Sequence, residues 1–125
     1  MNFTHIFTLE ESSFGKVVHA WADGISIGTS PIGLKDEEKI NEIDGLLLFH
    51  ENHDLDRSQQ ELMHLFEQKQ KAISKIDING TLSVALSNFS LWMDRNKCKT
   101  ILVTGSEELP KNPNLARFLE HLKEV

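Results

Sequence analysis

The stretch Leu46-Leu47-Leu48-Phe49 decides the fold, because it places four consecutive apolar residues between the turn signal Asp44-Gly45 and a polar cluster that begins at residue 50. An apolar run of this length without alternation is typical of a strand that is buried on both faces of a sheet. The run therefore indicates a sheet with covering elements on either side, and the flanking sequence has to supply them.

Downstream of this run, start signals, apolar periods and stop signals agree with one another. Ser58 and Glu61 form a capping box at the start of a helix, whose apolar face carries Leu62, Leu65, Phe66 and Ile73. Further elements follow in alternation: a strand over residues 72–78, a helix capped by Thr81, a strand over residues 100–103 and a last helix opened by Asn112-Pro113. This order predicts a mainly parallel sheet with right-handed crossovers, so we expect residues 1–125 to form a single domain, a small three-layer α/β sandwich.

The N-terminal third is less regular. Residues 4–9 predict a strand, because β-branched and aromatic side chains nearly alternate there. Residues 14–27 carry apolar side chains at helical spacing, but Asp23-Gly24 is a hairpin turn signal, and Gly15 with a β-branched pair beside it disfavours a helix. We therefore expect an antiparallel N-terminal hairpin, then a surface connection or mobile flap over residues 28–33, and a short helix from Asp36 to Ile43.

Composition and charge restrict the partners. Apolar residues make up 39% of the chain and charged residues 26%, which is enough apolar surface for a core. The net charge of -6 makes nucleic acid and anionic membrane surfaces poor partners, and the longest uninterrupted apolar run is far too short to span a membrane. The lone Cys98 and the N-terminal residues, which lack a basic start and a long apolar core, predict a cytoplasmic protein.

Three polar loops follow the predicted strands, at residues 50–54, 77–81 and 104–106. Ligands of open parallel sheets bind beyond the carboxyl ends of the strands, where such loops converge. We expect Glu51 and Asp77 to act as a general acid–base pair, and the candidate ligand-binding residues are His50, His53, Asn79, Thr104 and Ser106. The simpler interpretation, which we favour for each residue alone, is that Asp54, Asn79, Thr81 and Ser106 cap the helices that follow.

Several specific chemistries are disfavoured. A metal site at His50 and His53 would need the strand to end and bend, because these residues lie on opposite faces of an extended segment, and its third ligand would have to be Asp77 or His64. Gly15-Lys16 is followed by valine, which excludes a P-loop. Glu107-Glu108 would repel a pyrophosphate after residues 104–106, and Ser106 lacks the sequence of a nucleophile elbow. The sequence therefore indicates no particular cofactor.

Two hypotheses of different class remain. The first is a non-catalytic cytoplasmic module that binds a partner protein or a second copy of itself. This hypothesis is favoured because the sequence contains no motif for a specific chemistry. Exposure of Phe14 and Trp21 would favour such self-association. The alternative is a small-ligand binding protein or enzyme that acts on a polar, nucleoside- or sugar-like substrate at the carboxyl edge of the sheet, with Trp21 or Trp92 available for stacking.

Overall fold

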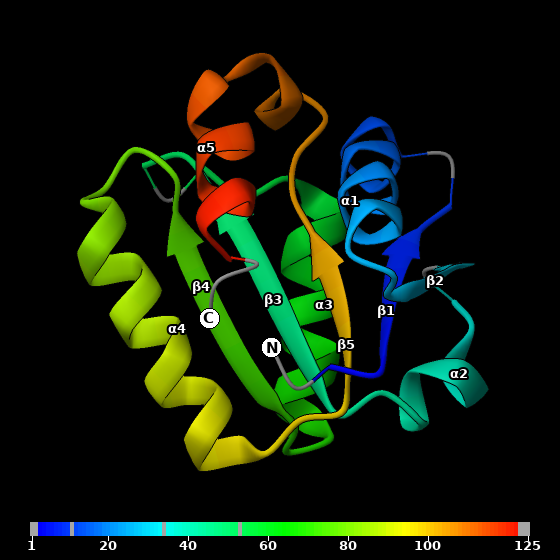
Figure 1. Cartoon of the computed structure of the whole chain (residues 1–125). Coiled ribbons are helices and arrows are strands. Elements are labelled where there is room, and N and C mark those ends of the chain that lie inside the picture. The colour runs from blue at the N-terminus through cyan, green and yellow to red at the C-terminus, as the bar shows by residue number, and fades with distance from the viewer. Residues whose placement is uncertain (1–2, 11, 34, 53, 123–125) are drawn as a thin grey trace.

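A single parallel sheet forms the centre of the fold. The computed structural model describes residues 3–10, 12–33, 35–52 and 54–122, and across them five strands pair in the order β2-β1-β5-β3-β4, all parallel (Figure 1). The strands are β1 (His5–Leu9), β2 (Gly28–Ile32), β3 (Gly45–His50), β4 (Ala72–Asp77) and β5 (Thr100–Thr104). The helices are α1 (Ser13–Gly24), α2 (Glu37–Asn41), α3 (Arg57–Gln68), α4 (Leu82–Asn96) and α5 (Pro113–Leu122), with the 3-10 turn η1 (Leu109–Lys111) before α5.

Helices cover both faces of the sheet, as Figure 1 shows. One apolar cluster gathers side chains of α1, α4 and α5 around residues such as Phe14, Phe89 and Phe118, and the other gathers α2 and α3 around Ile40 and Phe66. Every residue of β3 is buried, as the apolar run predicts. The expected three-layer α/β sandwich with a parallel sheet is confirmed, and among the described residues no helix is long and apolar enough to cross a membrane.

The helix α3 begins earlier than the sequence analysis predicts. Its capping box is Asp56 with Gln59 rather than Ser58 with Glu61: the Asp56 carboxylate accepts from the Gln59 N–H at 2.9 Å, and the Gln59 side chain accepts from the Asp56 N–H at 3.1 Å. Gln59 is fully buried and also donates to the Phe49 carbonyl at 3.0 Å, so burial selects this register. Helix α3 ends at Gln68, so residue 73 lies in β4 and not on the helix face.

The expected hairpin at residues 14–27 is wrong, because this segment forms helix α1. The Ser12 hydroxyl accepts from the Gly15 N–H at 3.1 Å and caps the helix, while Phe14, Val18 and Ala22 are buried in the core. A Cβ at Gly15 would lie 3.1 Å from the Leu9 carbonyl oxygen, so a small residue allows the helix to start against β1. Asp23-Gly24 ends the helix instead of turning a hairpin, and no antiparallel strand pair results within the described sheet.

The expected flap at residues 28–33 is also wrong, since it contains the edge strand β2. This strand pairs with β1 in parallel, from His5 opposite Gly28 to Leu9 opposite Ile32. A hydrogen bond of 2.8 Å joins the His5 Nε2 and Ser30 Oγ atoms, so tertiary pairing holds a segment that has little strand propensity of its own. The helix capped by Asp36 is present, as expected, but it ends at Asn41 rather than Ile43.

Candidate functional site

Two hollows lie at the carboxyl edge of the sheet, where the loops after β3, β4 and β5 emerge. The first, which we name the amide pocket, measures about 340 Å³ and is lined by Asp77, Ile78, Asn79, Gly80, Thr81, Leu82, Ala85, Asn114, Arg117 and Phe118. The second, which we name the acidic pocket, measures about 390 Å³ and is lined by Glu51, Asp54, Asp56, Ser106, Glu107 and Glu108. The polar loops identified from the sequence therefore contribute to both hollows.

The wall of the amide pocket is a network of side-chain amides that joins the β4–α4 loop to the start of α5. The Asn79 Oδ1 atom accepts from the Asn112 amide at 2.9 Å and from the Asn114 amide at 3.2 Å. The Asn112 Oδ1 atom in turn accepts from the Asn114 backbone N–H at 2.9 Å. The two bonds to Asn79 connect residues that are more than 30 positions apart in the chain, so the pocket wall is formed before any ligand arrives.

The Asp77 carboxylate supports the floor of the same loop. Its Oδ1 atom accepts from the Asn79 backbone N–H at 2.9 Å and from the Asn52 backbone N–H at 3.3 Å. The Asp77 carbonyl also accepts from the Gly80 N–H at 3.1 Å and closes the turn into α4. Asp77 thus orients the loops after β3 and β4, whatever further role it has toward a ligand.

Beside the Asp77 carboxylate, the amide pocket also carries positive charge at its rim. Helix α4 starts at its rim, and in the part of the chain that the structure describes the N-cap hydroxyl of Thr81 makes no capping hydrogen bond. The first N–H groups of a helix carry partial positive charge. Arg117 lies on the rim, and its guanidinium adds a full positive charge, while the buried ring of Phe118 supplies an apolar surface.

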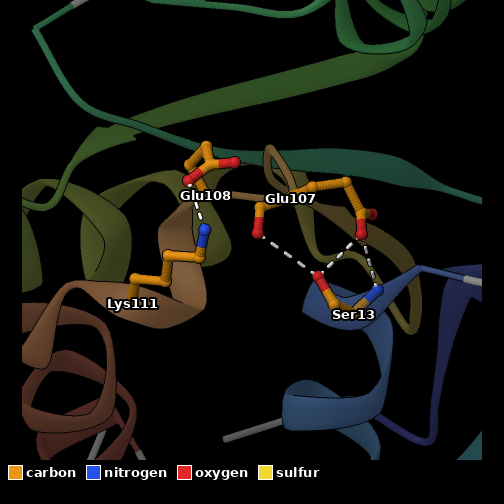
Figure 2. A network of polar contacts seen from close by, with 4 residues as sticks. All are labelled: Ser13, Glu107, Glu108 and Lys111. Atoms are coloured by element: carbon orange, nitrogen blue, oxygen red, sulfur yellow. Dashed lines mark hydrogen bonds and ion pairs between the residues drawn. The ribbon is translucent and has the colours of Figure 1, made fainter.

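The acidic pocket is bordered by a clamp between Glu107 and the start of α1. The Ser13 hydroxyl donates to the Glu107 Oε2 atom at 2.7 Å and the Ser13 N–H donates to the same atom at 3.2 Å, as Figure 2 shows. The Ser13 hydroxyl also lies 3.3 Å from the Glu107 carbonyl oxygen. The hydrogen bond from the Ser13 side chain is the largest of the causes that hold the pKa of Glu107 below its ordinary value. The Glu107 carboxylate thus occupies the N-terminus of α1.

The charge of the acidic pocket disfavours anions. Five of its six lining residues are acidic, and Lys111 is paired with one of them, Glu108, at 2.9 Å (Figure 2). Among the described residues, no group of three or more His, Cys, Asp or Glu side chains is arranged to hold a metal ion. The Asp56 carboxylate is engaged as the N-cap of α3. The pocket therefore has strong negative potential without the geometry of a cation site.

The structure distributes the residues predicted for the site over several places. Asp77 and Asn79 line the amide pocket, whereas Glu51 and Ser106 line the acidic pocket. Strands β3 and β4 are neighbours, but the two carboxylates proposed as an acid–base pair face different hollows. His50 and Thr104 line neither hollow and are 3% and 2% exposed. His53 lies outside the described residues.

Sequence reasoning missed the contribution of the last helix. Asn114 and Arg117 lie three positions apart and both line the amide pocket. Residues at this spacing lie on one face of a helix. The polar pair Asn114 and Arg117 therefore indicates a polar face in the first turns of α5. Its significance depends on α5 standing beside the β4–α4 loop, and this is a tertiary arrangement that periodicity does not indicate.

The aromatic side chains considered for stacking belong to the core. The Trp92 ring stacks on Phe89, with ring centroids 5.7 Å apart, and Trp21 packs against the same apolar cluster. Phe14 is 1% exposed, so the surface patch of Phe14 and Trp21 that would have favoured self-association is not present. Neither tryptophan contributes to the amide pocket or the acidic pocket.

Comparison with known proteins gives a structural match without a sequence family. No protein-family model matches the chain, and no curated protein matches it. The fold is similar to the crystal structure of a putative molybdenum carrier protein from Syntrophus aciditrophicus SB, with a TM-score of 0.78 over 99% of this chain and 94% of that chain. The two sequences are 16% identical, so the similarity establishes the fold alone.

Proposed function

We propose that this chain is a binding protein for a small polar molecule, nucleoside- or sugar-like, and that the ligand occupies the amide pocket. The observation that carries the proposal is the convergence of a carboxylate, two side-chain amides and a guanidinium over an apolar surface in one preformed hollow. A volume of about 340 Å³ lies within the range of small-ligand sites, which begins at about 300 Å³.

The lining chemistry suits a ligand that carries several hydroxyl groups. Asp77 accepts hydrogen bonds, the Asn114 amide both donates and accepts, and the Thr81 hydroxyl does the same. Leu82 and Ala85 are half-buried and offer an apolar surface against which a sugar or base ring would pack. A few oriented polar groups beside an apolar surface are the usual composition of such sites.

A binding function fits the pocket better than catalysis does. The Asp77 Oδ1 atom accepts from two backbone N–H groups, and the second carboxylate of the expected acid–base pair, Glu51, lines the other pocket. General acid–base catalysis needs both groups within reach of the reacting atoms. We therefore interpret Asp77 as a residue that positions the loop and contacts the ligand.

An anionic group on the ligand would add affinity, because Arg117 and the start of α4 both lie at the pocket rim. This observation also favours a second candidate, the binding of an oxyanion. The structural neighbour is described as a putative molybdenum carrier, which supports a small-ligand function in general and makes molybdate a suitable probe. The acidic pocket is a poor place for such an ion, because like charges repel it.

Calorimetry and thermal-shift measurements with nucleosides, sugars, their phosphates and molybdate test the proposal. Arg117→Gln removes the exposed positive charge, and we expect about 10-fold to 100-fold weaker binding of an anionic ligand, the loss typical of one charge-assisted hydrogen bond. Asp77→Asn keeps an oxygen for the two backbone N–H groups and should preserve folding while it weakens binding of hydroxyl-bearing ligands.

The matched control is Arg95→Gln, which removes the same charge from the last turn of α4, away from the pocket. This variant should bind as the original protein does. Absence of binding across the whole panel, or unchanged affinity in both pocket variants, would show that the amide pocket is not the site.

A further inference from the structure

The two edges of the sheet differ in their capacity to pair with another strand. At one edge, β2 contains Pro31, which has no N–H to donate and blunts strand addition. At the other edge, β4 runs over Ala72–Asp77 without a proline, and its six residues are enough for a short ladder. Strand addition is therefore favoured at the β4 edge, beside α4 at the margin of the sheet in Figure 1.

The direction of the β4 backbone groups follows from its pairing with β3. The Ile78 N–H donates to the His50 carbonyl at 3.0 Å, and in a parallel ladder alternate residues of a strand bond to the same neighbour. Residues 74 and 76 thus bond to β3, whereas the N–H and C=O groups of residues 73 and 75 and the N–H of Asp77 point toward the open edge. The Asp77 carbonyl already accepts from the Gly80 N–H at 3.1 Å. Lys75 and Asp77 are the central charged residues of this outward set.

Helix α4 extends the same edge with an uncharged surface. From Leu82 to Met93 it carries no charged residue, and its Val84 and Leu91 side chains are 56% and 52% exposed. A groove of about 200 Å³ separates β4 from α4, and both Lys75 and Val84 line it. Exposed aliphatic side chains beside an unpaired strand are typical of a surface that another protein covers.

We propose that a second copy of this chain covers this surface, with the two β4 strands antiparallel and Lys75 of each copy opposite Asp77 of the other. The pairing does not require a ligand in the amide pocket, although Asp77 takes part in both. It rests on the self-complementary charge pattern of β4, which a two-fold axis at Ile76 converts into two ion pairs.

Charge selects this register among the neighbouring ones. Outward-pointing residues must face one another to exchange both backbone hydrogen bonds, and an axis at residue 74, 75 or 76 pairs at least two of the outward residues 73, 75 and 77 with outward residues of the second copy. An axis at 75 places the two Lys75 side chains together, and an axis at 74 places Lys75 opposite Ile73. The axis at 76 pairs Lys75 with Asp77 twice and leaves no like charges opposite each other.

The two side chains are able to form these pairs. Residues two apart in a strand project from the same face of the sheet, so Lys75 of one copy and Asp77 of the other would lie on one face. Lys75 is exposed, and both hydrogen bonds described for the Asp77 carboxylate go to its Oδ1 atom. Val84 lines the same groove and would be buried near the two-fold axis.

Light scattering after size exclusion, over a concentration series, tests the pairing. The original chain should give twice the 14.2 kDa mass of one chain. Lys75→Asp alone places Asp opposite Asp77 and should give the mass of a single chain. Asp77→Lys alone places Lys opposite Lys75 and should also give the mass of a single chain. An equimolar mixture of these two variants restores both ion pairs and should give the double mass. The matched control is Lys35→Asp, an exposed lysine elsewhere in the chain, which should keep the double mass.

A single-chain mass for the original protein at every concentration would overturn the proposal, and so would a Lys75→Asp variant that keeps the double mass. The second result would indicate that Lys75 prevents strand pairing at the β4 edge, which is the usual role of a lysine on an edge strand. Circular dichroism checks that Asp77→Lys folds. If it does not, Val84→Asp replaces it: a single-chain mass supports the pairing, and an unchanged double mass refutes it.

Discussion

Gly105→Ala tests the packing beneath the acidic pocket. Gly105 is buried between Thr104 and Ser106, both of which the sequence analysis selects as ligand-binding residues. An alanine Cβ at this position would lie 2.6 Å from the Leu109 Cδ1 atom and 2.6 Å from the Phe14 Cε2 atom. We therefore attribute the glycine to the close approach of two core side chains rather than to a ligand.

The magnitude follows from these distances. Carbon atoms are in favourable contact at about 3.5–4.0 Å, so the new methyl group overlaps each neighbour by about 1 Å. Phe14 and Leu109 are 1% and 0% exposed, so neither side chain relieves the overlap by turning into solvent. Overpacking of this kind costs about 1–3 kcal/mol, from which the lower chain entropy of the unfolded alanine variant subtracts about 0.4–1 kcal/mol. We expect a net loss of about 1–2 kcal/mol in the free energy of unfolding.

Urea unfolding measures this loss, and Gly24→Ala is the matched control. A Cβ at Gly24 meets no atom within 4 Å, so the same substitution at the end of α1 should leave stability unchanged or raise it by about 0.5–1 kcal/mol. The reasoning is refuted if Gly105→Ala is as stable as the original protein, or if both variants lose the same free energy.

Three further predictions concern single side chains. Gln59→Ala leaves a β3 carbonyl without its buried donor and should cost about 1–3 kcal/mol in urea unfolding, whereas Gln60→Ala, on the exposed face of α3, should cost less. Since the pKa of Glu107 is lowered in the folded state, its carboxylate stabilises the fold above the ordinary glutamate pKa, and this contribution is lost as the pH falls through the folded value. Glu107→Gln should therefore be less stable than the original protein at pH 7, and the difference should shrink toward pH 3; a constant difference contradicts the pKa assignment. Burial, followed by the nearby Asp44 charge, raises the pKa of the Cys98 thiol, so iodoacetamide should label it slowly in the native state and rapidly in urea.

The part of the fold that follows residue 36 could be predicted because local signals and tertiary structure agree there. The apolar run in β3 has both faces buried in the structure, and Asn112-Pro113 opens the last helix. The position of the α3 capping box differs by two residues, because the buried hydrogen bonds of Gln59 decide between two adjacent capping patterns. Such a choice depends on which side chain reaches the core, which spacing alone does not reveal.

The N-terminal third could not be predicted from the same signals. Asp23-Gly24 is a strong local turn pattern, yet burial of Phe14 and Val18 against the sheet stabilises the helix that precedes it. Gly15 counts against a helix in isolation, but its missing side chain allows close contact with β1. Strand β2 likewise depends on pairing with β1, because its own residues have weak strand preference.

The candidate site was predictable as an edge of the sheet but not as a particular pocket. The expectation that polar loops gather at the carboxyl ends of the strands requires only a parallel sheet. The division between two hollows depends on side-chain contacts, since Asn79 is bonded to the start of α5 while Ser106 faces the acids after β3. Arg117 joins the site through the packing of α5, which no local pattern specifies.

The clamp at α1 explains why the amide pocket is the better candidate. Ligands of open parallel sheets commonly bind where crossovers leave in opposite directions, which in this order is the region between β1 and β3. There the Glu107 carboxylate already accepts from the Ser13 N–H. Because Glu107 is part of the chain, its effective concentration at this N–H is high, and a free anion would have to displace it.

Recognition of a polar ligand is therefore favoured at the end of the edge strand β4, where Arg117 supplies a positive charge. Asp77 holds the pocket loop through its Oδ1 atom, and its charge faces Lys75 of the second copy in the proposed pairing. If both proposals hold, ligand binding and pairing share one residue, and any effect of the ligand on pairing must be matched by an equal effect of pairing on ligand affinity.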